Sequence, residues 1–189
     1  MLKNDEDLIL YHGSFCEVSK PDLTRCAKYK DFSQGFYLTT SEGQAQRFSR
    51  TSLKKAIVNG ITDGQRDYGI VSVFNCPIEE WNSLKICQFE TADESWLNCV
   101  VAHRRRETVV QTLMQYTNYD VIGGKIANDA TNATITAYMA GIYGTVGSQR
   151  AAQLCISLLL PERLKDQYCF RSQRSINALH FVRSYQVWK

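Results

Sequence analysis

Three short stretches, far apart in the chain, carry residues that could together bind a sugar and an amide. The first, residues 10–14, places His12 directly before Gly13 at the end of an apolar run. An imidazole can hydrogen-bond a sugar hydroxyl, and the adjacent backbone N–H and C=O can pair with a carboxamide. Glycine has no side chain, so a ligand can approach the main chain closely there. A ribose joined to a nicotinamide offers both groups.

The second stretch, residues 35–41, is rich in aromatic and β-branched residues and ends in Ser41, a residue type that caps helices. It predicts a strand, a polar turn and then a helix. Such a unit could hold Tyr37 of the strand and Phe48 of the helix on opposite sides of a flat ring. The alternative is an ordinary core strand, in which both rings pack inside the protein.

The third stretch, residues 166–170, predicts a short strand with Gln167 and Cys169 on one face. A glutamine has the hydrogen-bonding shape of a carboxylate but cannot ionise. Gln167 can therefore orient a ribose, but it cannot act as a general base. The alternative for Gln167 is an exposed amide on a strand.

In this order, the three stretches resemble the signature of the ADP-ribosyltransferases, in the His-Tyr-Glu branch shared by diphtheria-type toxins and poly-ADP-ribose polymerases. The matching residues are His12, Tyr37 and Gln167, the last standing where the family has a glutamate. The whole chain also resembles an uncharacterised bacterial family within that superfamily. The resemblance implies an α/β (α+β) fold with a split antiparallel sheet and surrounding helices. It also implies NAD as co-substrate.

The resemblance also implies a role for each residue of the site. His12 would fix the ribose, Gly13 would bind the carboxamide, and Tyr37 and Phe48 would enclose the nicotinamide ring. Ser41 would add a further hydrogen bond. The full NAD-binding set predicted in this way is Tyr11, His12, Gly13, Ser14, Tyr37, Ser41, Phe48 and Asn128.

The glutamine at position 167 leaves three outcomes open. The acceptor needs no base, or another acid serves, or transfer is lost and only NAD binding or slow hydrolysis remains. Asp129 is the candidate for the other acid. It follows Asn128 at the end of a predicted strand, 119–128, which a glycine pair interrupts. The alternative is that Asn128 or Asp129 simply caps the helix predicted over 132–143.

The elements that position these residues follow from hydrophobic periodicity. Residues 51–67 contain two turn dipeptides and predict an exposed connection. At 189 residues and 44% hydrophobic side chains, the chain predicts one domain over 1–189. Strands are predicted over 8–11, 36–39, 68–75, 84–89, 119–128, 167–170 and 180–188, and helices over 42–50, 94–106, 108–116, 132–143, 148–160 and 171–179.

Composition narrows the classes of protein. No run approaches the roughly 20 apolar residues of a membrane span, and the acidic residues 1–7 predict no secretory signal. The seven cysteines are odd in number and lack C-x-x-C spacing. They predict reduced thiols in a cytoplasmic protein with no zinc site. Three histidines offer no metal cluster.

The charge of the chain does not identify its partner. A net charge of +3 neither requires nor excludes nucleic acid. Residues 103–106 are basic and predict either a solvated helix end, favourable to the helix dipole, or contact with an acidic or polyphosphate partner.

We therefore expect an enzyme that transfers ADP-ribose from NAD to a macromolecular acceptor, protein or nucleic acid, and releases nicotinamide. By analogy with the resembled family, it would be a bacterial toxin or defence effector with a cognate inhibitor protein and no membrane partner. Two alternatives are an NAD glycohydrolase and a catalytically silent module that binds NAD or ADP-ribose.

Overall fold

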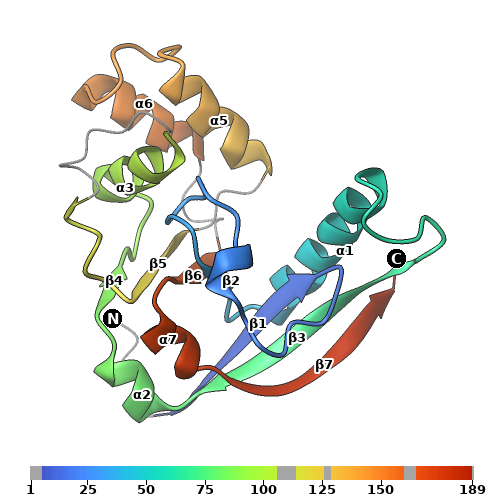
Figure 1. Ribbon diagram of the computed structural model, residues 1–189. Coiled ribbons are helices and arrows are strands. Elements are labelled where there is room, and N and C mark those ends of the chain that lie inside the picture. Colours follow the sequence, from blue (N-terminus) through green and yellow to red (C-terminus); the bar gives the residue numbers. More distant parts are fainter. Residues whose placement is uncertain (1–5, 106–113, 126–128, 160–164, 189) are drawn as a thin grey trace.

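The computed structural model describes residues 6–105, 114–125, 129–159 and 165–188. Its strands form two sheets (Figure 1). The first has the order β1-β3-β7 and is antiparallel throughout: β1 (Leu8–Ser14), β3 (Tyr68–Cys76) and β7 (His180–Trp188). The second has the order β2-β6-β5-β4: β2 (Phe36–Leu38), β6 (Asp166–Phe170), β5 (Val121–Lys125) and β4 (Ile86–Gln88).

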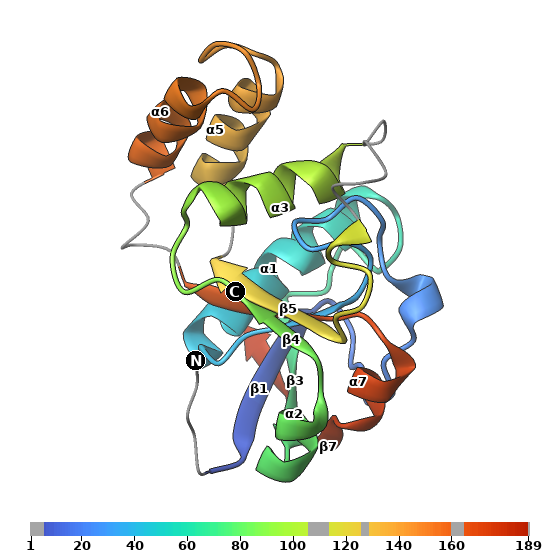
Figure 2. The ribbon, with the colours of Figure 1, turned by 90° about the vertical axis from the view of Figure 1, so that its left-hand side faces the viewer.

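Helices surround both sheets, so the chain is mixed α/β, which confirms the predicted α+β class. The helix α1 packs along β1 and β3, whereas α5 and α6 pack against each other beyond α3 (Figure 2). The helical segments are η1 (Leu23–Arg25), α1 (Glu42–Val58), α2 (Ile78–Ser83), α3 (Glu94–Arg104), α5 (Asp129–Met139), α6 (Gln149–Leu159) and α7 (Gln173–Asn177).

The expected sheet was antiparallel, but the four-stranded sheet is only partly so. β2, β6 and β5 are antiparallel neighbours, but β4 pairs with β5 in parallel. The chain leaves β4, passes through α3 and returns to β5. Such a crossover connection brings two strands into the same direction.

β1 and β2 join the two sheets. The main chains of Tyr11 and Thr39 exchange two hydrogen bonds, of 2.9 and 3.1 Å. On its other side β2 pairs with β6, where Tyr37 lies opposite Cys169. The three stretches singled out in the sequence therefore lie on neighbouring strands, in the spatial order β1, β2, β6.

Buried apolar side chains form a separate cluster on each side of the four-stranded sheet and a third under α1. Trp96 is fully buried in the first cluster. The first includes Phe32, Trp96, Leu97, Val100, Ile122, Ile135, Ala151 and Cys155. The second includes Leu8, Leu10, Phe36, Leu38, Phe74, Trp81, Tyr168 and Phe170. The third consists of Ala45, Val71, Val73 and Val187.

The helix predicted over 42–50 is longer than expected. α1 continues to Val58, so the exposed connection predicted over 51–67 is wrong in its first half. Leu53 and Ala56 are buried and continue the apolar face of the helix. Burial of that face against the sheet outweighs the turn dipeptides that follow, which only end the helix.

Two other predicted helices have a different outcome. The one predicted over 132–143 begins earlier and ends earlier, as α5. The one predicted over 108–116 falls mostly on residues 106–113, which lie outside the described residues.

All seven cysteines lie in the described part of the chain, as free thiols, and four are buried. None of the helices in the described ranges combines the length and apolar character that crossing a membrane requires.

Candidate functional site

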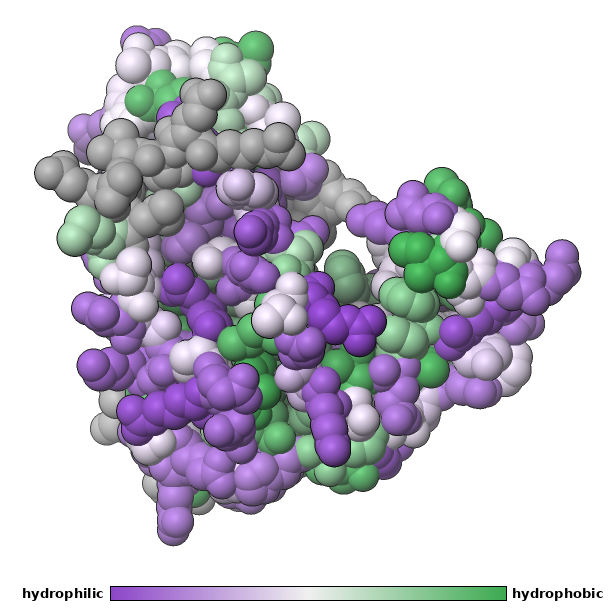
Figure 3. Space-filling view, in the orientation of Figure 1, coloured by the Kyte–Doolittle hydropathy of each residue, from purple (hydrophilic) through white to green (hydrophobic). Residues whose placement is uncertain are grey.

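A cavity of about 920 Å³ lies between α1 on one side and, on the other, the C-terminal end of α3 and one face of α5. The space-filling view shows the molecule hollowed between these two parts (Figure 3). The volume is typical of cofactor and substrate sites. A smaller cavity of about 460 Å³, beside Arg171, contains none of the predicted residues. The large cavity brings together Tyr11, His12, Gly13, Tyr37, Phe48 and Gln167.

Gly13 presents an unused pair of backbone groups to this cavity. Tyr11 bonds Thr39 through both its N–H and its C=O, so both point away from β3. Backbone direction repeats every second residue of an antiparallel strand, and the register of β1 is unbroken. The N–H and C=O of Gly13 therefore face the same open edge, where no described residue bonds them. A carboxamide fits such a donor and acceptor.

The reason for a glycine at position 13 differs from the one expected. A Cβ there would lie 2.0 Å from the main-chain oxygen of Ala45, so α1 itself crosses too close for any side chain. Helix packing by itself therefore requires the glycine. The backbone edge that Gly13 offers to the cavity is unaffected by this contact.

His12 is held as a neutral imidazole with one nitrogen to spare. Its Nδ1 lies 2.8 Å from the main-chain oxygen of Tyr37, and its ring lies on that of Phe36, with centroids 4.4 Å apart. A carbonyl can only accept, so Nδ1 carries the proton and Nε2 is an acceptor. Burial lowers the pKa of His12, and the hydrogen bond to Tyr37 opposes this only in part. Among the described residues nothing bonds Nε2, which leaves it for a hydroxyl.

Tyr37 is fixed by its hydroxyl to the loop before β2. The hydroxyl donates to the main-chain oxygen of Ser33 over 2.8 Å and accepts from the N–H of Phe32 over 3.0 Å. Burial, followed by the neighbouring Cys169, raises the pKa of Tyr37 well above its ordinary value, so the phenol stays neutral. Its role in the cavity is therefore that of a rigid ring, not an acid or a base.

The α1 wall of the cavity carries Phe48 and Gln44. Phe48 is 51% exposed, so it is not packed in the core, and the core-strand alternative is wrong for this ring. Gln44 is only 9% exposed, and its Oε1 is buried with no hydrogen-bond partner in the described part of the chain. A buried polar atom without a partner is costly. A ligand in the cavity could supply the partner.

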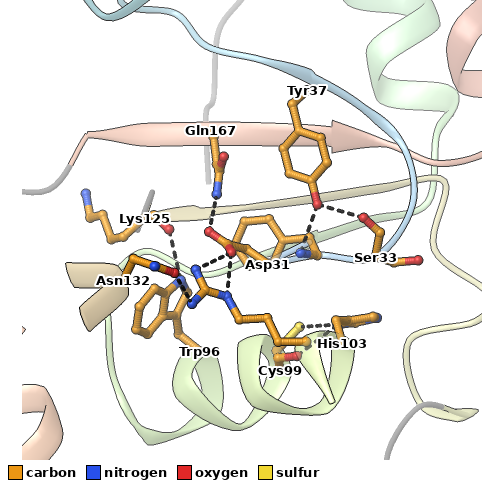
Figure 4. Close-up of polar contacts among 11 residues, drawn as sticks. Asp31, Ser33, Tyr37, Trp96, Cys99, His103, Lys125, Asn132 and Gln167 are labelled. Carbon is orange, nitrogen blue, oxygen red and sulfur yellow. Dashed lines mark hydrogen bonds and ion pairs between the residues drawn. The ribbon is translucent and has the colours of Figure 1, made fainter. Parts of the chain in front are cut away.

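Gln167 belongs to a polar network on the opposite wall (Figure 4). It is 6% exposed, so the alternative of an exposed strand amide is wrong. Its Nε2 donates to Oδ2 of Asp31 over 3.1 Å. Arg104 pairs with Oδ1 of Asp31 through Nε and Nη2, at 2.8 and 2.6 Å, and donates from Nη1 to Asn132 over 2.8 Å. All four side chains line the cavity.

Positive charge surrounds the mouth of the cavity. The exposed side chains of Lys20, Arg25, Lys30 and Lys55 are among its lining residues, and with Arg104 they outnumber the lining carboxylates. A cavity with this charge balance attracts anions such as a pyrophosphate. The described residues contain no group of three or more His, Cys, Asp or Glu arranged to hold a metal.

Comparison with known families adds one assignment. A family model described as "Protein of unknown function (DUF3990)" matches residues 8–181, which include every strand of the cavity wall. The chain belongs to the DUF3990 family. No curated protein matches it. Because the DUF3990 family is described without an activity, the function of this member must be argued from the site.

Two residues predicted for the site in this DUF3990 chain are not brought into the cavity, and the side chains of two others lie outside the described part of the chain. Ser14 and Ser41 are described but do not line it. Ser41 occupies the N-cap position of α1 without a side-chain cap hydrogen bond. Asn128 lies outside the described residues, and for Asp129 only the main chain, at the start of α5, is described.

Sequence reasoning missed Asp31, Gln44 and Asn132 as cavity residues, and it left Arg104 between two interpretations. Arg104 is ion-paired and 12% exposed, and His103 beside it is buried, so the solvated helix end predicted for this basic run is wrong at both positions. The basic run was the only signal in the sequence for these residues. Because cations are buried only with partners, a buried arginine in this run implies an acidic partner elsewhere in the chain.

Proposed function

We propose that this chain cleaves the bond between nicotinamide and ribose in NAD and transfers ADP-ribose to a macromolecular acceptor. The observation that carries the proposal is the pairing of the open Gly13 backbone edge with the free Nε2 of His12 inside one cavity. The first matches the carboxamide of nicotinamide, and the second matches a ribose hydroxyl. In NAD the ring that carries the carboxamide and the ribose that carries the hydroxyls are joined by a single glycosidic bond.

The chemistry needs little covalent help from the protein. The C1′–N bond breaks and its electron pair leaves with nicotinamide, so positive charge develops on the ribose. A nucleophilic atom of the acceptor then bonds C1′, and its proton is released. What the protein must supply is position. His12 and Gly13 fix the two halves of the nucleoside, while Tyr37 and Phe48 border the space for the ring.

The positive charge at the mouth of the cavity is suited to the pyrophosphate part of the substrate. The pyrophosphate of NAD fits the cations that line the cavity, and a volume of about 920 Å³ can hold a dinucleotide. Lysines and arginines that the pyrophosphate does not use remain for an acidic acceptor, protein or nucleic acid. As part of the same proposal, and by analogy with the resembled transferases, the chain acts in the cytoplasm as a toxin or defence effector restrained by an inhibitor protein.

A second candidate is a silent module that binds NAD or ADP-ribose. Gln167 favours it, because an amide cannot ionise and the residue is engaged by Asp31. Both candidates share the NAD site and differ only in turnover.

One experiment separates these functions. The purified chain is given NAD labelled in its adenylate phosphate, with and without a cell lysate, and nicotinamide and labelled macromolecules are measured. Label in nuclease-sensitive or protease-sensitive material supports transfer and identifies the acceptor class. Nicotinamide release without label indicates a glycohydrolase. NAD binding without release indicates the silent module, and neither binding nor release would contradict the NAD site.

A further inference from the structure

We infer that Asp31 is a positioning residue of this site, whose carboxylate turns the amide of Gln167 so that its oxygen is left to bind a ribose hydroxyl. This inference rests on the proposed function and deepens it. Nothing in the local sequence around Asp31 indicated such a role, because its partners lie 73 and 136 positions away.

The hydrogen bond between the two residues can form in only one way. A carboxylate has acceptors alone, whereas a glutamine amide has a donor side and an acceptor side. Asp31 must therefore face the NH₂ of Gln167, at 3.1 Å from Nε2. Oε1 then points to the other side, where no residue in the described ranges bonds it. The carboxylate partner therefore decides which way this amide is turned.

Asp31 is itself held rigidly. Arg104 donates to Oδ1 from two nitrogens, which leaves Oδ2 for Gln167. The side chains of Asp31 and Arg104 are only 13% and 12% exposed, and Asn132 fixes the far end of the guanidinium. The close-up shows this network converging from the loop before β2, α3, α5 and β6 (Figure 4). Charge-assisted hydrogen bonds of this kind are strong and directional.

The orientation matters because of the charge that develops on the ribose. An amide oxygen carries the negative end of the amide dipole and accepts the hydrogen bond of a hydroxyl, which stabilises a nearby cation. An amide turned the other way would present its positive end. A carboxylate at position 167 would present an acceptor however it rotated, so only a glutamine needs an orienting partner. In the reaction step neither residue gains or loses a proton; the proton of the acceptor goes to solvent.

The test uses four variants of the full chain and the rate of nicotinamide release from NAD. Asp31→Asn removes the charge and lets the amide of Gln167 turn, so kcat/KM should fall by about ten-fold or more. Adding Gln167→Glu to Asp31→Asn restores an acceptor that needs no orientation, and most of the rate should return. Gln167→Glu alone puts two carboxylates side by side, which share a proton, so its rate should depend on pH in a way the double variant's does not.

Asp166→Asn is the matched control. It breaks an ion pair of similar length, 2.9 Å to Lys125, at the position next to Gln167, but Asp166 does not line the cavity. Its rate should equal that of the wild type. Thermal unfolding of every variant separates lost activity from lost fold. Should Asp31→Asn not fold, Arg104→Lys takes its place, because it keeps the charge but not the two guanidinium donors that hold Oδ1 of Asp31.

The outcomes separate this inference from the proposed function. A wild-type chain that neither binds NAD nor releases nicotinamide overturns both. An active wild type whose rate is unchanged by Asp31→Asn, or by Arg104→Lys in its place, overturns the inference alone. A folded, inactive Asp31→Asn variant that Gln167→Glu fails to restore also overturns it, because Asp31 would then act by another route.

Discussion

The imidazole of His12 on β1 donates a hydrogen bond from Nδ1 to the main-chain oxygen of Tyr37 on β2, across 2.8 Å. This contact joins the two sheets at the wall of the cavity, close to the main-chain bridge between Tyr11 and Thr39. It fixes both the position of the ring and the nitrogen that remains available. The acceptor Nε2 therefore results from the fold, before any ligand binds.

The protonation of His12 predicts how activity depends on pH. Burial lowers the pKa of His12, so the ring is neutral at neutral pH. Acidification through that pKa would convert Nε2 from an acceptor into a donor. We expect kcat/KM for nicotinamide release to fall on the acid side, and His12→Asn to lack this limb of the profile. A wild-type rate that rises as the pH falls would contradict this role.

Substitution of Gln44 should raise stability and weaken ligand binding. Its Oε1 is buried without a partner among the described residues, so Gln44→Met should stabilise the chain by about 1 kcal/mol. The same change should weaken NAD binding, measured by calorimetry. Gln46→Met on the same helix is the control. Gln46 donates to the Tyr185 hydroxyl, so this substitution should slightly destabilise the chain. Unchanged NAD affinity in Gln44→Met would exclude Gln44 from the site.

Two glycines predict opposite effects of the same substitution. A Cβ on Gly13 would lie 2.0 Å from the main-chain oxygen of Ala45, so Gly13→Ala should cost about 3 kcal/mol or more. A Cβ on Gly43 would meet only the flexible end of Arg47, at 3.6 Å. Gly43→Ala should stabilise α1 by about 0.5 kcal/mol. Chemical denaturation measures both, and a tolerated Gly13→Ala would contradict the packing described for β1 and α1.

The strands of the site could be predicted because each carries its signal locally. The apolar run before His12 and the aromatic run around Tyr37 indicate strands wherever they occur. Even so, local signals failed where burial decided the outcome. The turn dipeptides after residue 58 were correct as turns, but the face formed by Leu53 and Ala56 extends α1 up to them.

The polar network could not be predicted from the sequence. Asp31 lies in a loop with no periodicity, and only folding brings it to Arg104 and Gln167. Two interpretations of Arg104 were open, because a basic run at a helix end is common on surfaces and in anion sites. A contact between distant loops and helices has no pattern that a single sequence displays.

His103 predicts acid sensitivity of the fold. Burial lowers its pKa from 6.5 to about 4, with Nδ1 bonded to the main-chain oxygen of Cys99 and Nε2 buried without a described partner. Between these values the unfolded chain binds more protons, so the free energy of unfolding falls as the pH falls. The loss from this residue should approach about 3 kcal/mol. His103→Asn should make the free energy of unfolding depend less on pH, as measured by chemical denaturation at several pH values. An unchanged slope of that free energy against pH would contradict this prediction.

The proposed NAD site is tested most directly by nicotinamide release from NAD, compared between the wild-type chain and His12→Asn. The asparagine amide can keep the donor to the Tyr37 oxygen but has nothing in place of Nε2. We expect the wild type to release nicotinamide and the variant to be slower by about ten-fold or more, with little change in thermal unfolding. Equal release by both chains would contradict the assignment of His12, and the absence of both release and NAD binding in the wild type would contradict the site itself.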